Sequence, residues 1–292
     1  MLIGAGRNRL EPRNAGCFMR KLPLRLCHLC IAAGFALFSQ FSSGAELRIL
    51  NVSEPPTSYT AEGKLTGFVT EVVEKIEQDM GIKTPIETVP ASRALAYLEH
   101  APNVMAFTFA KTPEREALGL AFVGPLTTRD QIVWMRKGKG YKIASANDIK
   151  QQHLLLGSPI GDWRTKYFLE QGVKVDPSDA HEFDLEHLNR GWIDVCALSD
   201  LEMPYVAQAR KIDAANFEAA FVFAPAVKAY LVFSKNTPAD TIRRWEAALQ
   251  NLGKTGFLND TAKKWSAPNY PLGYDESKGF FLDQNGKGRI AP

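Results

Sequence analysis

Cysteine is scarce in this chain, which has 4 in 292 residues. Cys17, Cys27 and Cys30 lie near the amino terminus, and Cys196 follows alone inside the apolar run 193–198. We expect Cys196 to be a buried, unreactive thiol. The other three cysteines belong to an amino-terminal segment that we expect to be removed, as described next, so Cys196 is the one cysteine of the mature chain. A single cysteine cannot form an internal disulfide, and the folded part must therefore be held together by its hydrophobic core.

Apolar runs long enough to cross a bilayer, which takes about 20 residues, are also missing. The candidate run, residues 29–38, follows three basic side chains within residues 20–25 and precedes the small residues 43–45. This order is typical of a secretory signal. We therefore expect residues 1–45 to be a signal peptide, cleaved after Ala45, and the mature protein to reach the periplasm.

A strong excess of one charge is absent once the leader is removed. The whole chain has 35 basic and 32 acidic residues, a net charge of +3, and the leader holds six of the basic residues and one acid. The mature chain therefore has a net charge of about −2, which gives no basis for binding nucleic acid or an anionic membrane surface. Met19 heads the signal, so residues 1–18 are a candidate for a misassigned start.

Motifs of the common enzyme classes are missing as well. We find no nucleophile elbow, phosphate loop or metal-ligating cluster, and so predict no cofactor and no metal. The four histidines after the leader fall at predicted helix ends, strand starts or turns, away from the expected cleft: His100, His153, His181 and His187. Glu54 remains as the one candidate acid or base.

Two α/β patterns are present. The first alternates strands at 47–52, 85–89 and 104–108 with helices at 69–80 and 92–98. Such alternation predicts a parallel sheet covered by helices.

The second pattern contains strands at 154–156, 173–175, 193–198 and 217–223. It also contains a helix at 163–170 capped by Asp162, and another capped by Asp184. A further helix is predicted after Thr237 and Pro238.

Strands at 131–135 and 229–233 cross between the two patterns, so the sequence predicts two lobes joined by hinge strands. The first lobe is predicted at 46–134 plus 230–265 and the second at 135–229. The tail, 266–292, is rich in glycine, proline and polar residues, and we expect it to be irregular.

A candidate binding residue lies just beyond the strand that ends at Thr108. Thr112 is positioned to cap a short helix with Pro113 as its first residue, which places Arg115 at the carboxyl end of a strand. Open α/β sheets bind ligands there, and a guanidinium can grip a carboxylate with two hydrogen bonds. The alternative for Arg115 is a solvated residue at a helix start.

Several short motifs occur in one order along the chain. They are Pro55-Pro-Thr-Ser-Tyr59, Gly63-Lys-Leu-Thr-Gly-Phe68, Thr112-Pro-Glu-Arg115, Gly191-Trp-Ile-Asp-Val195 with Asp200, and Phe233-Ser-Lys-Asn-Thr-Pro238. This order resembles the periplasmic solute-binding proteins of family 3, which serve ABC importers. The resemblance covers nearly all of residues 46–265 and implies a two-lobed fold that captures a small amino-acid-like or cationic solute by hinge closure.

The resemblance also implies roles for individual residues. Arg115 would bind a solute carboxylate, and Asp200 would accept an α-ammonium group from the second lobe, unless it only caps the following helix. Thr108 would face the ammonium group with its carbonyl and side chain. Ala91 would form part of an apolar wall.

Other positions depart from the family pattern. Ala110 replaces a hydroxyl residue, so one hydrogen bond to the carboxylate is missing. Gly161, Asp162 and Trp163 stand where the family has Gly-Thr-Thr, and Asp162 would use the free N–H groups for its own cap. Trp163 and Arg164 instead offer a stacking face and a second cation.

Two charged residues have open roles. Glu54 stands where the family often has an aromatic lid, and it either binds a cationic solute end or is an exposed turn residue. Arg93 faces either the cleft or the solvent.

Three functions are compatible with these features. The first is a monomeric solute-binding protein that works with an inner-membrane ABC permease or a sensor. The second is a periplasmic enzyme on the same scaffold, because some relatives resemble cyclohexadienyl-amino-acid dehydratases. The third is a domain that has lost its ligand and serves as an interaction partner.

Overall fold

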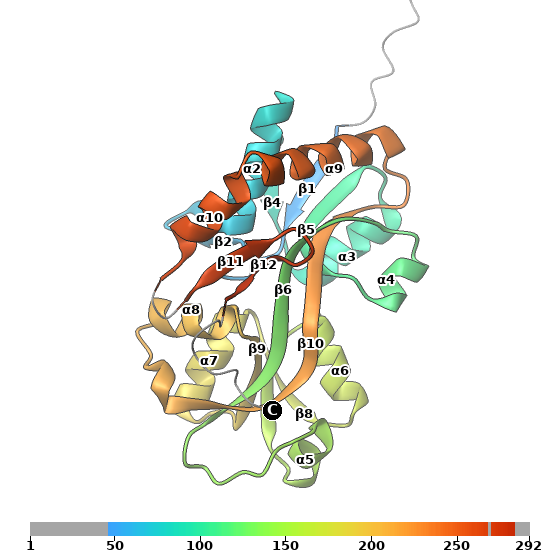
Figure 1. Ribbon diagram of the computed structural model, residues 1–292. Coiled ribbons are helices and arrows are strands. Elements are labelled where there is room, and N and C mark those ends of the chain that lie inside the picture. The colour runs from blue at the N-terminus through green and yellow to red at the C-terminus, as the bar shows by residue number, and fades with distance from the viewer. Residues whose placement is uncertain (1–45, 268–269, 284–292) are drawn as a thin grey trace, which may run out of the picture. The chain divides into compact units, whose positions relative to one another are not determined.

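The computed structural model describes residues 46–267 and 270–283 (Figure 1). The predicted signal peptide, with its cleavage site, lies outside the described residues, as does the end of the tail. Within the described part, no helix combines the length and apolar character needed to span a membrane.

One large sheet runs through the molecule in the order β4-β1-β5-β10-β6-β9-β7-β8. Strands β4, β1 and β5 are parallel, and with the helices around them they form the first lobe. Its elements are β1 (Arg48–Asn51), the hairpin β2 (Tyr59–Ala61) and β3 (Lys64–Thr66), α2 (Phe68–Met80), β4 (Ile86–Thr88), α3 (Ala91–His100), β5 (Val104–Ala110) and α4 (Pro113–Ala117).

A second parallel set, β9, β7 and β8, forms the sheet of the second lobe. Its elements are α5 (Ala146–Gln151), β7 (Leu155–Pro159), α6 (Trp163–Glu170), β8 (Lys174–Ser178), α7 (His181–Arg190), β9 (Val195–Ser199), α8 (Glu202–Ala209) and the short 3-10 helix η1 (Ala214–Asn216). This α/β arrangement, with mostly parallel sheets flanked by helices, agrees with the fold predicted from the sequence.

Two long antiparallel strands join the sets and run side by side in Figure 1: β6 (Ala121–Arg136) and β10 (Phe217–Phe233). The sequence predicted two separate strands, at 217–223 and 229–233, where β10 is one. The pairing of β10 with β6 continues through this region because register shifts absorb the irregular stretch around Pro225. The predicted lobe boundaries at 134/135 and 229/230 fall inside these strands and stay a prediction.

Alternating side chains of each strand pack on opposite faces of the sheet. In β1, Ile49 joins the core beneath α2, whereas Leu50 joins the core beneath α3. In β9, Cys196 packs with α7 and α8, and Ala197 packs on the other face with α5 and α6. Helices on both faces therefore bury both sides of the sheet, and Cys196 is fully buried as predicted.

The predicted helix ends are confirmed in part. Gly81 ends α2 with φ of 67°, and Asp162 caps α6 through a 2.8 Å hydrogen bond from Arg164 N. Helix α7 begins at His181, three residues before the predicted cap Asp184, which lies inside the helix with its side chain buried. After β10, Pro238 rather than Thr237 precedes α9 (Ala239–Lys254), and α10 (Phe257–Trp265) follows.

The predicted irregular tail contains a hairpin, which corrects that expectation. Strands β11 (Leu272–Asp275) and β12 (Gly279–Leu282) pair with each other, and Phe280 of β12 pairs with Thr127 of β6. Tyr270, Leu272 and Phe280 are buried in the first-lobe core. The polar composition of the tail predicted an irregular segment, because it does not show that these few apolar residues are buried and order the chain.

Candidate functional site

Thr108 is a bulge residue within strand β5, beside the candidate site. Its neighbours Phe107 and Phe109 pair with Leu231 and Tyr230 of β10, so Thr108 is an extra residue in a bulge. Its φ is 68°, a conformation that is costly for a β-branched residue. Strained residues of this kind cluster at functional sites, and here the bulge directs the backbone of Thr108 out of the strand ladder.

Arg115 is held over the end of the same strand by α4. The Thr112 hydroxyl accepts from Arg115 N at 3.3 Å, and the guanidinium donates to the Ala110 carbonyl at 2.7 Å. It also lies 4.8 Å from the centre of the Phe109 ring. Burial lowers the pKa of Arg115. Within residues 46–267 and 270–283 Arg115 makes no ion pair, so its charge is available to an anion.

A small cavity brings these residues together with others from both lobes. Its volume is about 40 Å³, and its lining consists of Val52, Ser53, Glu54, Ala91, Thr108, Phe109, Ala110, Arg115, Arg129, Asp162, Trp163 and His181. Pockets that hold small molecules usually measure roughly 300 Å³ or more. The walls must therefore move apart before the cavity can admit even a small solute.

A larger groove of about 840 Å³ adjoins the cavity, sharing Arg115, Asp162 and Trp163 with it. Helices α3 and α4 form one wall and α6 the other. Leu118 and Leu169, two large apolar side chains with exposures of 39% and 56%, line the groove. This groove gives the cavity an approach from solvent.

Behind the cavity, Arg164 is buried in a polar cluster, with an exposure of 1%. Its Nε donates to Asp162 Oδ1 at 2.9 Å, and its Nη1 donates to Glu202 Oε2 at 2.9 Å and Gln131 Oε1 at 3.1 Å. Its Nη2 lies 2.6 Å from His181 Nε2. All three guanidinium nitrogens are therefore engaged.

Glu202 is positioned by a capping box at the start of α8. Ser199 N donates to Glu202 Oε2 at 2.8 Å, and the Ser199 hydroxyl accepts from Glu202 N at 3.2 Å. The same Oε2 accepts from Arg164, so the cap fixes a fully buried carboxylate against the guanidinium.

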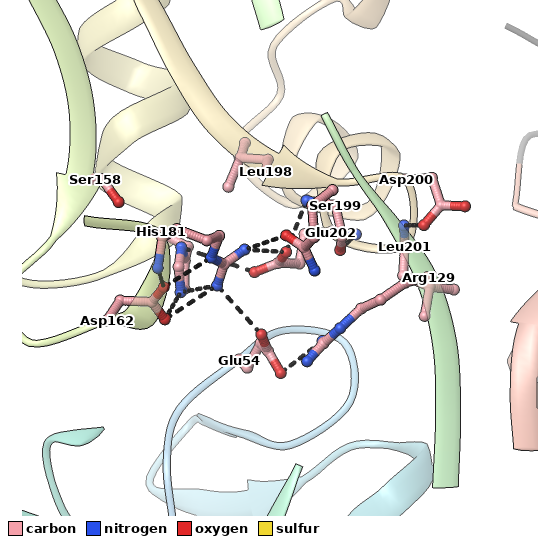
Figure 2. A network of polar contacts seen from close by, with 12 residues as sticks. Glu54, Arg129, Ser158, Asp162, His181, Leu198, Ser199, Asp200, Leu201 and Glu202 are labelled. Atoms are coloured by element: carbon pink, nitrogen blue, oxygen red, sulfur yellow. Dashed lines mark hydrogen bonds and ion pairs between the residues drawn. The ribbon is translucent and has the colours of Figure 1, made fainter. Parts of the chain in front are cut away.

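Glu54 connects this cluster to the first lobe. Its Oε1 lies 3.4 Å from Arg164 Nη2 and its Oε2 lies 2.6 Å from Arg129 Nη1 (Figure 2). The loop that carries Glu54 is docked on α2, whose first N–H groups donate to the carbonyls of Pro56 and Thr57. Glu54 is thus a buried bridge between lobes, with an exposure of 6%, and not an exposed turn residue.

The charges of the cluster stabilise one another. Burial opposes the ionisation of Asp162 and Glu202, but chiefly the Arg164 guanidinium outweighs it, holding the pKa of Asp162 well below its usual range and that of Glu202 at about 2. Burial and Arg164 favour a neutral His181, yet Glu202 and Asp162 raise its pKa on balance. The 2.6 Å contact with Arg164 requires Nε2 to accept, so protonation of His181 would break it.

Three members of the cluster could in principle ligate a metal. Glu54, His181 and Glu202 each bring one ligand atom within 4.8 Å of the others. The Arg164 guanidinium contacts all three, however, so a cation already lies between them.

Comparison of the sequence with known protein families shows the family of this chain. The profile of the bacterial extracellular solute-binding proteins, family 3, matches residues 48–268. The chain belongs to this family. No curated protein matches the chain.

Solved structures share the fold of this family 3 protein. A variant of ArgBP from T. maritima is 19% identical, with 75% of this chain and 94% of that chain covered and a TM-score of 0.65. An ABC uptake transporter substrate-binding protein from Streptococcus pneumoniae with bound histidine is 16% identical (75% and 91% covered, TM-score 0.64). A histidine kinase sensor domain with similarity to periplasmic binding proteins is also 16% identical (75% and 95%, 0.66).

The predicted site residues of this family 3 protein separate into two groups. Six of them line the cavity with Arg115: Thr108, Ala110, Glu54, Ala91, Asp162 and Trp163. Arg164 lies behind it in the buried cluster. Arg93 is exposed on α3 and is not among the lining residues.

Asp200 is also absent from the lining and stands apart from the cluster in Figure 2. Its Oδ1 accepts from Asp130 N at 3.1 Å and Leu201 N at 2.9 Å, so it ties β6 to the start of α8. Burial and the nearby Asp130 raise the pKa of Asp200 to about 7. The acid that contacts Arg164 in the buried cluster is Glu202, two residues further along the chain.

Sequence reasoning missed Arg129, Gln131, His181 and Glu202. The expectation that every histidine lies away from the cleft is wrong for His181, which lines the cavity because α7 begins there. Glu202 had a usable signal, the Ser-x-x-Glu spacing of a capping box. Gln131 had a weaker one, since it is a polar residue at the start of the predicted strand 131–135, whereas Arg129 lay outside that strand and had none.

Proposed function

We propose that this protein is a periplasmic solute-binding protein that encloses a small carboxylate-bearing solute between its two lobes. The observation that carries the proposal is the cavity in which Arg115, which has no ion-pair partner in the described part of the chain, lies beside the bulged Thr108. Family membership supports a solute-binding role.

In this proposal Arg115 grips the solute carboxylate, as the predicted anchor of the site. Thr108 and Ala110 contribute backbone groups, and Ala91 and Trp163 enclose the rest of the solute from either lobe. Arg129 offers a further donor, because its buried Nε has no hydrogen-bond partner among the described residues.

Solute uptake requires the lobes to separate, since the cavity of about 40 Å³ is far smaller than the roughly 300 Å³ or more of pockets that usually hold small molecules. The long strands β6 and β10 are the connections that would bend. The groove lined by α3, α4 and α6 would then widen into the entry path.

The partner in this proposal is an inner-membrane ABC permease or a membrane sensor. Solved relatives in the same fold include both an uptake-transporter binding protein and a histidine kinase sensor domain. We expect the protein itself to act as a monomer.

A thermal-shift screen tests the proposal. The purified protein is heated with amino acids, hydroxy and oxo acids, polyamines, short peptides and quaternary amines. A solute at about 100 times its dissociation constant should add roughly 2.7 kcal/mol of stability. Loss of the shift in Arg115→Ala supports the carboxylate site, whereas an equal shift in that variant contradicts it. A screen without any hit would contradict solute binding.

His181 favours a second candidate, an enzyme such as a dehydratase on the same scaffold. This histidine lines the cavity and has Asp162 and Glu202 beside it, which are the elements of a general acid or base. Consumption of a bound solute over time, abolished in His181→Asn, would favour the enzyme. A solute that stays unchanged would favour the binding protein.

A further inference from the structure

The cavity has two carboxylates among its lining residues, Glu54 and Asp162. A solute with an ammonium or guanidinium group needs such an acceptor, because a buried cation is tolerated only when it is paired. Whether these two carboxylates are free or already paired therefore decides whether the cavity can bind a solute with a cationic group.

Both carboxylates are already bound by arginines of the chain. Asp162 accepts from Nε and Nη2 of Arg164 at 2.9 and 3.3 Å. Glu54 pairs with Arg164 through Oε1 and with Arg129 through Oε2. Figure 2 shows Glu54 between Arg129 and the cluster that contains Asp162 and Glu202.

Arg164 cannot easily be displaced by a solute. Its side chain is held by the cap Asp162, by the Glu54 loop and by side chains of β6, α7 and α8. Its removal would leave Glu202, which has no exposure, without its guanidinium partner. Breaking a buried pair by removing one partner is strongly unfavourable. A cationic solute therefore does not displace the Arg164 guanidinium from these carboxylates.

We infer that Arg164 is a specificity-determining residue, whose guanidinium takes the place that a solute's cationic group would need. The cavity then accepts small acids that carry no cationic group and disfavours zwitterions and basic solutes. This inference rests on the proposed function and narrows its solute class to acids such as 2-hydroxy or 2-oxo acids, with the carboxylate on Arg115.

Matched solutes test the inference on the wild-type protein by isothermal titration calorimetry. A series of 2-hydroxy acids of increasing length is compared with the corresponding α-amino acids, amino-acid amides and arginine; lactate, alanine and alaninamide form the first set. We expect the hydroxy acid of at least one set to bind about tenfold or more tightly than its amino acid, because an added buried cation lacks a partner. The amides and arginine should not bind.

The outcomes separate the inference from the proposed function. An amino acid that binds as tightly as its hydroxy acid, or any binding of arginine, would overturn the inference and leave solute binding in place. Failure of every solute in the series would overturn the inference, and it would overturn the proposed function as well if the thermal-shift screen also gave no hit.

A variant tests the role of Arg164 directly. In Arg164→Ala the freed carboxylates should bind guanidinium, so low, non-denaturing guanidinium chloride should raise the melting temperature more than sodium chloride at equal concentration. The wild type and Arg243→Ala, which changes an exposed arginine paired with Asp240, should show no such difference. A folded Arg164→Ala variant without this response would overturn the assignment. If the variant does not fold, the wild-type titrations decide.

Discussion

At the residue scale, the site depends on buried charges whose partners come from distant parts of the chain. Glu54, Gln131, Asp162 and Glu202 all contact Arg164, although 148 residues separate the first of them from the last. The local sequence signals only the capping roles of Asp162 and Glu202, and nothing in it signals the contacts with Arg164. They come together on Arg164 only when β6, α6 and α8 fold around its guanidinium.

Asp184 gives a prediction about pH. It is fully buried beside Gly157, and burial raises its pKa from 3.8 to about 7. Between these values the unfolded chain is ionised while the folded chain keeps the proton, so stability should fall as the pH rises from about 4 to 7. Asp184→Asn should remove this loss and stabilise the protein at pH 8 by roughly 2–4 kcal/mol.

Urea unfolding of the wild type and Asp184→Asn at pH 5 and pH 8 measures the effect. Asp200, whose pKa is also about 7, leaves part of the slope in the variant. The exposed Asp179→Asn serves as control and should follow the wild type. A wild-type slope retained in full by Asp184→Asn would contradict the assignment.

At the scale of elements, the sequence predicted the regular parts better than the site. Helix α2 has apolar periodicity and Gly81 at its end, and helix α6 has the cap Asp162, all of which are local signals. The position of Asp200 could not be read in this way, because it and Glu202 lie two residues apart at the start of α8. Which acid turns inward depends on the Ser199 capping box, which is a local signal, and on Arg164, which is distant in the sequence.

The junction between α2 and the Glu54 loop gives an element-scale prediction. Gly67 has φ of 125°, and a Cβ there would lie 2.3 Å from Thr57 O. Gly67→Ala should push the loop from the helix and destabilise the protein by about 2–4 kcal/mol.

Chemical denaturation checks this expectation, with Gly63→Ala as the matched control. Gly63 also has positive φ, at 76°, but a Cβ would meet nothing within 4 Å. Its substitution should cost about 1 kcal/mol, the price of the backbone conformation alone. Equal costs for the two variants would contradict a steric role for Gly67.

At the scale of the whole molecule, polar side-chain contacts bridge the lobes besides the shared strands. Glu54 reaches Arg164, and the Tyr59 hydroxyl bonds the Tyr205 hydroxyl of α8. The Tyr59 hydroxyl is protonated at neutral pH, and burial raises its pKa further. We expect these contacts to favour the small form of the cavity.

The tyrosine pair predicts a coupling between the lobes. A double-mutant cycle with Tyr59→Phe and Tyr205→Phe should give an interaction energy of about 1 kcal/mol. Because the bond favours closure, each single variant should also speed solute association in stopped-flow measurements. Additive effects on stability and unchanged association would show that the bond does not restrain the lobes.

The central claim is that Arg115 anchors a solute carboxylate, and calorimetric titration of the first solute identified tests it most directly. Loss of a bidentate charge-assisted contact in Arg115→Ala should weaken binding by on the order of 100-fold. Arg93→Ala, an exposed arginine of α3 outside the cavity lining, should bind like the wild type. Equal dissociation constants for the wild type and Arg115→Ala would contradict the account.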